Sequence, residues 1–304
     1  MEGTVLRSTG SFYEVLTDKG VSVSCTARGK LRLEGFKESN PIAVGDRVVI
    51  DTANKIGSIT EILPRTNHIL RQSVKKTGHA HVLAANVDQV FLIVTLAYPK
   101  TSLGFIDRFL VSAESFRIPQ TLVFNKKDLL DDEALYYQEQ LMTIYRDIGV
   151  GAKAISALDD GYKNLLPLLE GQTTLFAGHS GVGKSTILNR IDPSIGQKTG
   201  EISGFSEKGI HTTTFAEMFR IADRTFIIDT PGVKEWGLVD MGEQELSDYF
   251  PEMRDRRLDC KFGSRCLHVN EPRCAVLDAV ESGEIAPSRY DSYVSILLGK
   301  DNRK

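Results

Sequence analysis

The first sixty-odd residues alternate polar and apolar positions over short stretches that turn residues separate. Residues 12–16, 21–25 and 44–50 each predict a β-strand, and glycines and an Asp-Lys-Gly turn interrupt the pattern. Several short strands without a helical period predict a small closed barrel. We expect a barrel of the oligonucleotide-binding (OB) type, and other small barrels would produce a similar pattern.

After residue 87 the pattern changes to continuous apolar runs that alternate with amphipathic segments. Runs of strand length, typical of strands buried on both faces, occupy residues 90–94, 121–124, 174–177 and 226–228. Residues 105–116 and 132–146 carry apolar positions at helical spacing, and a further helix is expected near residues 273–282. The alternation predicts an α/β region with a mostly parallel sheet and helices on both sides.

Composition narrows the class of protein further. The chain has 304 residues, of which 41% are hydrophobic and 25% charged, enough for two or three packed domains. No apolar run approaches membrane-spanning length, and the first residues lack the pattern of a signal peptide, so we expect a cytoplasmic protein without membrane contact. A net charge of -3 argues against a uniformly basic nucleic-acid binder.

One basic strip departs from this average. Residues 62–87 contain no Asp or Glu, and their basic residues and histidines are Arg65, His68, Arg71, Lys75, Lys76, His79 and His81. The strip has two interpretations, a solvated linker or a surface that meets a phosphate backbone. The sequence does not separate them.

A phosphate-binding loop follows the run 174–177 and precedes a segment that can begin a helix. Its glycines let backbone amides converge on phosphate oxygens, Lys184 should reach the outer phosphates, and the Ser185 hydroxyl should ligate Mg²⁺. The alternative is a glycine-rich turn without a ligand. The residues expected to bind are Gly178, His179, Ser180, Gly181, Val182, Gly183, Lys184, Ser185 and Thr186.

A guanine-reading motif, Asn-Lys-x-Asp, follows the apolar run 121–124. Asn125, Lys126 and Asp128 form it, and the Asp128 carboxylate can accept from the N1 and N2 donors of guanine, which adenine lacks. Ser156 and Ala157 fit the backbone segment that supports the base. GTP and GDP are therefore favoured over adenine nucleotides.

The third nucleotide element is Asp229-Thr230-Pro231-Gly232, after the run 226–228. Asp229 is expected to hold Mg²⁺ through water, and the amide of Gly232 to meet the third phosphate. Val233 stands where a water-orienting Gln often occurs. In the preceding loop, one threonine, for which we choose Thr213, should bind Mg²⁺, and His211 can position the attacking water or be an ordinary surface histidine.

The order of these motifs is unusual. The guanine reader comes about fifty residues before the phosphate loop, whereas the phosphate loop comes first in ordinary GTPases. The sequence therefore predicts a circularly permuted GTPase, in which Lys184 and His211 are the expected catalytic residues.

The last sixty residues contain a cluster of possible metal ligands. Cys260, Cys266, His268 and Cys274 offer three thiolates and an imidazole, enough for one closed, structural zinc site. Reduced cysteines in a small core are the alternative. Basic residues surround the cluster, as would suit a module that faces RNA: Arg254, Arg256, Arg257, Lys261, Arg265 and Arg273.

On these motifs and their order, the whole chain resembles the ribosome small-subunit-dependent GTPase A family, known as RsgA or YjeQ/YloQ. The resemblance implies an OB-fold barrel at 1–66, a circularly permuted P-loop GTPase domain at 67–240 and a small α-helical zinc domain at 241–304. It also implies that the chain binds the small ribosomal subunit and its rRNA late in subunit maturation, with hydrolysis stimulated by the subunit. We expect a monomer.

The chain departs from the family pattern at one place, and its motifs leave two alternative functions. Five residues separate Cys260 from Cys266, whereas the family usually has four. Because Val233 replaces the usual Gln, the main alternative function is a nucleotide-gated rRNA-binding module with incidental hydrolysis. An ATP-using P-loop enzyme is disfavoured by Asn125 and Asp128.

Overall fold

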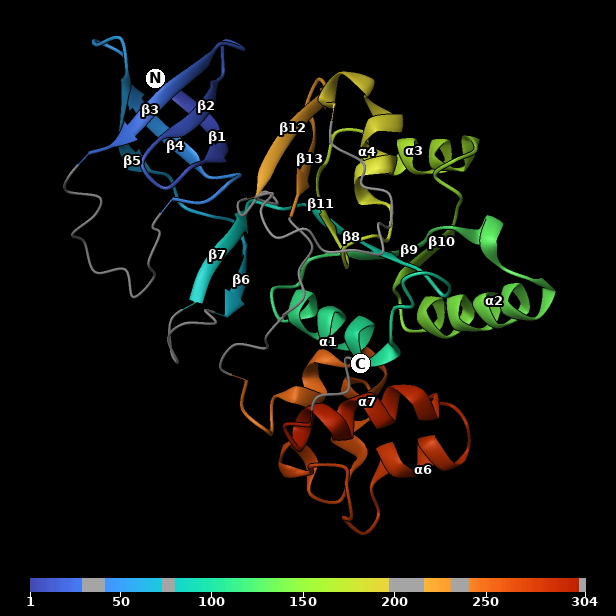
Figure 1. Cartoon of the computed structure of the whole chain (residues 1–304). Coiled ribbons are helices and arrows are strands. Elements are labelled where there is room, and N and C mark those ends of the chain that lie inside the picture. The colour runs from blue at the N-terminus through green and yellow to red at the C-terminus, as the bar shows by residue number, and fades with distance from the viewer. Residues whose placement is uncertain (29–41, 73–79, 197–215, 231–240, 301–304) are drawn as a thin grey trace.

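The computed structural model describes residues 1–28, 42–72, 80–196, 216–230 and 241–300. Figure 1 shows a β-barrel at the N-terminus, a sheet flanked by helices in the middle and a helical part at the C-terminus. In the ranges given above, no helix is both long and apolar enough to cross a bilayer.

The N-terminal strands close into a barrel. Neighbouring strands pair in the order β1 (Glu2–Ser8), β2 (Tyr13–Thr17), β3 (Ser22–Ala27), β5 (Gly57–Ile62) and β4 (Arg47–Asp51). The β1–β4 pairing closes the circle, and β3 and β5 run parallel. The alternating apolar side chains point inward, among them Val5, Val15, Cys25, Val48 and Ile59. The predicted small closed barrel of OB type is thereby confirmed, and it has five strands.

Part of the basic strip has a structural role that neither interpretation foresaw. The Arg65 guanidinium forms two hydrogen bonds to the fully buried carboxylate of Asp46, with Nε 2.7 Å from Oδ1 and Nη2 2.8 Å from Oδ2. A buried carboxylate requires such a partner. The strip also contains a hairpin of β6 (His68–Gln72) and β7 (Ala80–Ala85), which the sequence analysis did not predict. Lys75, Lys76 and His79 lie outside the described residues.

The central sheet continues from the barrel. Its parallel strands are ordered β10 (Gly151–Ala154), β9 (Gln120–Phe124), β8 (Gln89–Val94), β11 (Thr173–Ala177) and β13 (Thr225–Asp229). The next strand in the sheet, β12 (Glu217–Ala222), pairs antiparallel with β13 and also with β1 of the barrel. The four predicted apolar runs are β8, β9, β11 and β13, and the mostly parallel sheet is confirmed.

Helices cover both faces of this sheet (Figure 1). The helices α1 (Leu103–Glu114) and α2 (Asp132–Asp147) pack on one face, and α3 (Leu166–Leu169) and α4 (Lys184–Ile191) on the other. The side chain of Ser102 caps α1, and that of Asp131 caps α2, by accepting from free amides of the first turn. Short 3₁₀ turns lie at Lys127–Leu129, Asp160–Leu165 and Pro193–Ile195.

The C-terminal part is small and helical. Its helices are α5 (Pro251–Arg254), α6 (Ala275–Glu281) and α7 (Pro287–Leu297). A 3₁₀ turn at Leu246–Tyr249 precedes α5, and two more, at Arg257–Asp259 and Gly263–Arg265, lie between α5 and α6. The expected helix at 273–282 is α6. Helix α7 was not predicted, because its buried face includes Arg289 and Ser292 and so shows no clean apolar period.

Candidate functional site

The nucleotide motifs meet at one edge of the sheet. Asn125 follows β9, the phosphate loop follows β11, and Asp229 ends β13. These strands are parallel and lie close together in the order β9, β8, β11, β13, so their carboxyl ends meet at the same edge (Figure 1). The order of the motifs along the chain does not affect this meeting, since only the spatial order of the strands determines it.

Asn125 connects the guanine reader to the phosphate loop. Its buried side chain donates from Nδ2 to the carbonyl of Val182 at 2.8 Å and accepts at Oδ1 from the amide of Ala157 at 2.9 Å. Gly183 has a φ of +99°, and a Cβ on it would lie 2.3 Å from Asn125 Nδ2. The loop therefore needs glycine at this position, and three distant segments are fixed to one another through a single amide.

Lys184 is folded into the phosphate loop. Its Nζ donates to the carbonyls of Gly178, at 2.7 Å, and His179, at 2.9 Å, and the residue is only 7% exposed. Burial lowers the pKa of Lys184, and the charge of Asp229 partly opposes this. The ammonium group thus lies within the loop, at the start of α4, where phosphate oxygens would bind.

The chemistry of Asp229 fits a cation site. Its Oδ1 is buried and accepts no hydrogen bond from the part of the chain that the structure describes. Burial raises the pKa of Asp229 to about 6, against the nearby charge of Lys184. A buried carboxylate oxygen without a donor, close to the N-terminal turn of α4 that carries Ser185, is the donor set that Mg²⁺ takes in P-loop enzymes.

The base-reading residues form the other side of the site. Lys126 has a left-handed backbone, with φ of 63°, and its Nζ donates to the carbonyl of Tyr98 at 2.6 Å. Burial lowers the pKa of Lys126. Asp128 is exposed in the 3₁₀ turn Lys127–Leu129, whereas Ser156 is 1% exposed in the chain segment that Asn125 holds. The carboxylate of Asp128 is therefore open to a ligand.

Two contacts of this site were missed from the sequence. The ring of His179 lies against Phe105 of α1, with centroids 3.8 Å apart, and burial lowers the pKa of His179. The carbonyl of Tyr98 holds Lys126. Phe105 was read only as a core residue, and no sequence signal pointed to Tyr98. Ser180 and Gly181 are exposed at the tip of the loop, and Thr186 is half-buried in α4.

Some expected residues cannot be located in this way. His211, Thr213 and Gly232, with Val233, lie outside the described residues.

The four expected metal ligands converge at a second, separate site. Cys260, Cys266, His268 and Cys274 are buried, and their ligand atoms all lie within 4.8 Å of one another. The Sγ of Cys274 is 3.8 Å from that of Cys260 and 3.7 Å from that of Cys266. A tetrahedral zinc ion with Zn–S bonds of about 2.3 Å sets sulfur atoms about 3.8 Å apart. These distances fit zinc and are far too long for a disulfide.

Hydrogen bonds organise the loop around this cluster. The Glu271 carboxylate accepts from the amides of Leu267, Val269 and Asn270 at 2.7–3.0 Å. These amide bonds outweigh burial and lower the pKa of Glu271. Burial raises the pKa of Cys274 to about 12, so this thiol would stay protonated near neutral pH without a metal. Five residues separate Cys260 from Cys266, and three of them form the 3₁₀ turn Gly263–Arg265.

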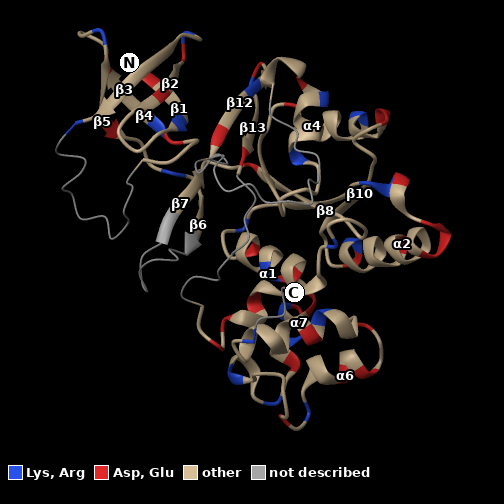
Figure 2. Cartoon of the chain, viewed as in Figure 1, with Lys and Arg blue, Asp and Glu red and all other residues tan. Residues whose placement is uncertain are grey.

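The basic residues around the cluster divide into two groups. Arg254 pairs with Glu114, Arg256 with Glu284 and Arg257 with Asp248, so these three have structural partners. Figure 2 shows acidic and basic residues interspersed over this part of the chain. Exposed residues that form no ion pair with any described residue are Lys261, Arg265 and Arg273.

Fold and site together define a circularly permuted P-loop GTPase with a C-terminal Cys₃His cluster. The model of the RsgA GTPase domain matches residues 62–239, and that of the RsgA N-terminal domain matches residues 2–59. The chain belongs to the RsgA GTPase family and is a GTP hydrolase.

Individual relatives agree with this assignment. The small ribosomal subunit biogenesis GTPase RsgA of Bacteroides fragilis is 48% identical over 100% of this chain and 98% of its own. The crystal structure of YjeQ from Thermotoga maritima matches with a TM-score of 0.78 and 35% identity, covering 100% of this chain and 99% of that one. YloQ, a circularly permuted GTPase, matches with a TM-score of 0.74 and 32% identity over 100% and 96% of the two chains.

Proposed function

We propose that this chain hydrolyses GTP with the residues that meet at the edge of the sheet. Asn125 and Asp128 read guanine, with Lys126, Ser156 and Ala157 supporting the base. The loop from Gly178 to Thr186 binds the phosphates, and Lys184 neutralises the charge that develops on the transferred group. The observation that carries this proposal is the pair of Asn125 hydrogen bonds, which ties the base-reading segment to the phosphate loop.

Metal binding follows from the same donor sets. We propose that Ser185, Asp229 through water, and Thr213 hold Mg²⁺ with GTP, and that Gly232 meets the third phosphate. The orphaned oxygen of Asp229 supports this role. We propose one structural Zn²⁺ at Cys260, Cys266, His268 and Cys274, with the sulfur spacing as support. Four protein ligands leave no open position for catalysis.

The partner we propose is the small ribosomal subunit, late in its maturation, contacted through rRNA. Support comes from the name of the relatives, which are small ribosomal subunit biogenesis GTPases. It also comes from the exposed cations Lys261, Arg265 and Arg273 beside the metal cluster. We propose that the chain acts as a cytoplasmic monomer with functional units at 1–66, 67–240 and 241–304, which the separate barrel and C-terminal cores support.

Purified small subunits are expected to stimulate GTP hydrolysis by this chain, whereas large subunits are not. Contact with RNA phosphates should make the stimulation fall as salt rises. The measurement is turnover against subunit concentration at two salt concentrations. Stimulation by neither subunit, with GTP binding intact, would favour instead a nucleotide-gated rRNA-binding module, which the Val233 position makes the main alternative.

His211 is proposed to position the attacking water, because Val233 cannot. The variant His211→Ala should lower the subunit-stimulated rate by about 100-fold, in the range of a lost general base, and leave the affinity for GDP unchanged. Single-turnover hydrolysis with small subunits measures the first effect and calorimetric titration the second. An unchanged stimulated rate would remove His211 from the mechanism.

A further inference from the structure

Helix α1 belongs to two hydrophobic cores at once. Phe105 and Phe109 pack into the core between α1 and the central sheet. Val111 is fully buried in the core of the C-terminal part, together with Phe250 and Tyr293. Asp107 and Val111 are one helical turn apart, so they lie on the same side of α1. The C-terminal part is therefore seated directly on the helix that covers the nucleotide-binding domain.

A buried ion network fixes the C-terminal part on α1. Arg289 of α7 is 1% exposed and donates to Asp107 Oδ1 of α1 at 2.7 Å and to Glu252 Oε1 of α5 at 2.8 Å. The Tyr145 hydroxyl of α2 donates to the same Asp107 oxygen at 2.9 Å. The guanidinium also lies over the ring of Phe250, 4.6 Å from its centroid. Four elements from the two domains thus meet around one guanidinium.

The charges of this network depend on one another. Burial disfavours the charged guanidinium, yet the carboxylates of Asp107 and Glu252 outweigh that effect and raise the pKa of Arg289 above its ordinary value. Burial, with the charge of Asp107, raises the pKa of Tyr145 well above its usual range. A buried charge that loses its partner is strongly unfavourable, so the C-terminal part cannot shift on α1 without breaking or carrying this network.

The other end of α1 touches the phosphate loop. Phe105, in the first turn, lies against the ring of His179 at a centroid distance of 3.8 Å. The carbonyl of His179 accepts a hydrogen bond from Lys184 Nζ. A displacement of α1 therefore reaches the catalytic lysine through two direct contacts, Phe105 to His179 and His179 to Lys184.

We propose that Asp107 and Arg289 are positioning residues for the nucleotide. Through α1 and Phe105 they fix the Gly178–His179 segment and hence Lys184, so that the seat of the C-terminal part sets the affinity for GTP and GDP. Asp107, Arg289 and Phe105 are not among the proposed nucleotide-binding residues, and they act on the nucleotide only through the phosphate loop. The proposal rests on the proposed nucleotide site and adds to it a route by which RNA bound near the metal cluster reaches that site.

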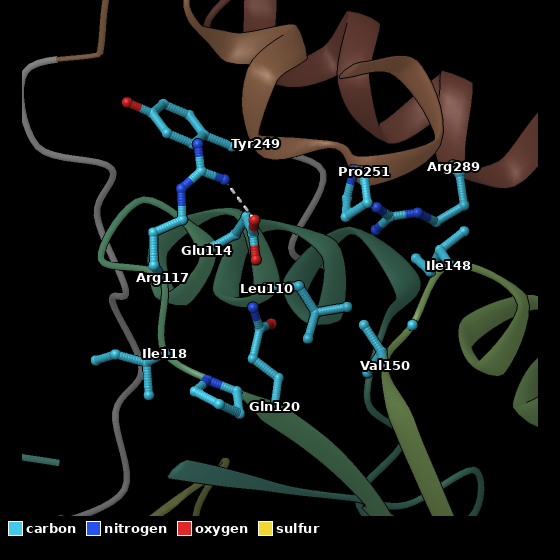
Figure 3. Close-up of a pocket in the computed structure, with 12 residues that line it drawn as sticks. Leu110, Glu114, Arg117, Ile118, Gln120, Ile148, Val150, Tyr249, Pro251 and Arg289 are labelled. Carbon is cyan, nitrogen blue, oxygen red and sulfur yellow. Dashed lines mark hydrogen bonds and ion pairs between the residues drawn. The ribbon is translucent and has the colours of Figure 1, made fainter. Parts of the chain in front are cut away.

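The polar contacts between α1 and the C-terminal part differ in burial. A cleft of about 240 Å³ opens beside Arg289, between the second half of α1 and the segment Tyr249–Pro251 (Figure 3). Glu114 and Arg117 line it at the far end of α1. The Arg117–Asp248 ion pair there, 3.2 Å long, is exposed, with side chains 54% and 35% accessible, so it contributes little. The Arg289–Asp107 pair, by contrast, is almost fully buried, and it acts together with the half-buried Arg254–Glu114 pair and the apolar core around Val111.

Calorimetric titration of the full chain with GDP tests the relay. Asp107→Asn, which keeps the shape of the side chain and removes its charge, is expected to weaken GDP binding by about fivefold or more, the scale of coupling between distinct sites. Phe105→Leu should weaken it in the same direction. The double variant should bind GDP no more weakly than the single variant with the lower affinity, because both changes interrupt one route.

The stoichiometry of the titration separates positioning from damage to the fold. An irreversibly misfolded fraction lowers the moles of GDP bound per mole of chain at an unchanged Kd, whereas reversible unfolding weakens the apparent Kd. Thermal unfolding therefore has to show that each variant is fully folded at the temperature of the titration, and the relay then predicts a changed Kd at full stoichiometry. If Asp107→Asn does not fold, Arg289→Lys, which keeps the charge and loses the planar fork, takes its place with the same expectation. Arg117→Ala is the matched control at the exposed inter-domain pair and should stay within twofold of the unmodified chain.

Three results would overturn the proposal. They are an unchanged Kd in folded Asp107→Asn or Arg289→Lys, losses that multiply in the double variant, and an equal loss in Arg117→Ala. Absence of GDP binding by the unmodified chain would instead refute the proposed nucleotide site, so the two failures are distinguishable.

Discussion

Replacing Lys184 by methionine is expected to lower kcat/KM for GTP hydrolysis by on the order of 10²–10³, the scale of losing one preorganised donor to a developing negative charge. Methionine fills most of the buried path of the lysine stem, so the loop should keep its shape. What disappears is the ammonium group, together with its hydrogen bonds to the carbonyls of Gly178 and His179. Steady-state hydrolysis with varied GTP measures the effect.

The matched control is Lys163→Met, on the same domain. Lys163 is exposed, and its ion pair among the described residues is with Asp160. The substitution should therefore leave kcat/KM within twofold of the unmodified chain. Equal rates for Lys184→Met and the unmodified chain would mean that the loop after β11 does not bind the phosphates.

Loss of the Cys₃His metal is expected to unfold the C-terminal part. Structural zinc contributes about 10–16 kcal/mol in small zinc-binding peptides, which is comparable to the whole stability of an ordinary domain. Three of the ligands are themselves core residues, Cys260, Cys266 and Cys274. Cys274→Ser should therefore bind less than one zinc per chain and make residues 251–297 sensitive to protease. Metal analysis and limited proteolysis measure these effects.

The chain supplies a natural control for that experiment. Cys25 is a buried free cysteine inside the barrel, remote in sequence from the cluster. Cys25→Ser should keep one zinc per chain and the protease resistance of the C-terminal part. A Cys274→Ser protein with full zinc content and unchanged proteolysis would contradict a structural zinc site.

Local motifs made much of the site predictable. The phosphate loop and the guanine reader are short segments whose chemistry is readable without the fold, and the structure brings Asn125, Ala157 and Val182 together as one hydrogen-bonded unit. The apolar runs predicted β8, β9, β11 and β13 because strands buried on both faces need such runs. The spacing of the cysteines and the histidine predicted the metal cluster, because few ligand sets fit zinc.

Features that depend on tertiary contacts were not predictable. Arg65 belongs to a basic strip in the sequence, yet its partner is the buried Asp46, nineteen positions earlier. Arg289 and Asp107 are 182 positions apart, on one helix whose pattern indicates only ordinary packing and on another that shows no clean apolar period. The face of α7 that holds Arg289 looks polar, because its burial depends on charges from another domain. Such pairs become visible only when both helices are in place.

A crystal structure of the chain with Mg²⁺ and a non-hydrolysable GTP analogue tests whether the distant motifs bind one nucleotide together. We expect one nucleotide, with its guanine edge at the Asp128 carboxylate and its phosphates within the loop from Gly178 to Ser185, in hydrogen-bond reach of Lys184. A nucleotide whose base lies away from Asp128, or whose phosphates lie outside that loop, would contradict it.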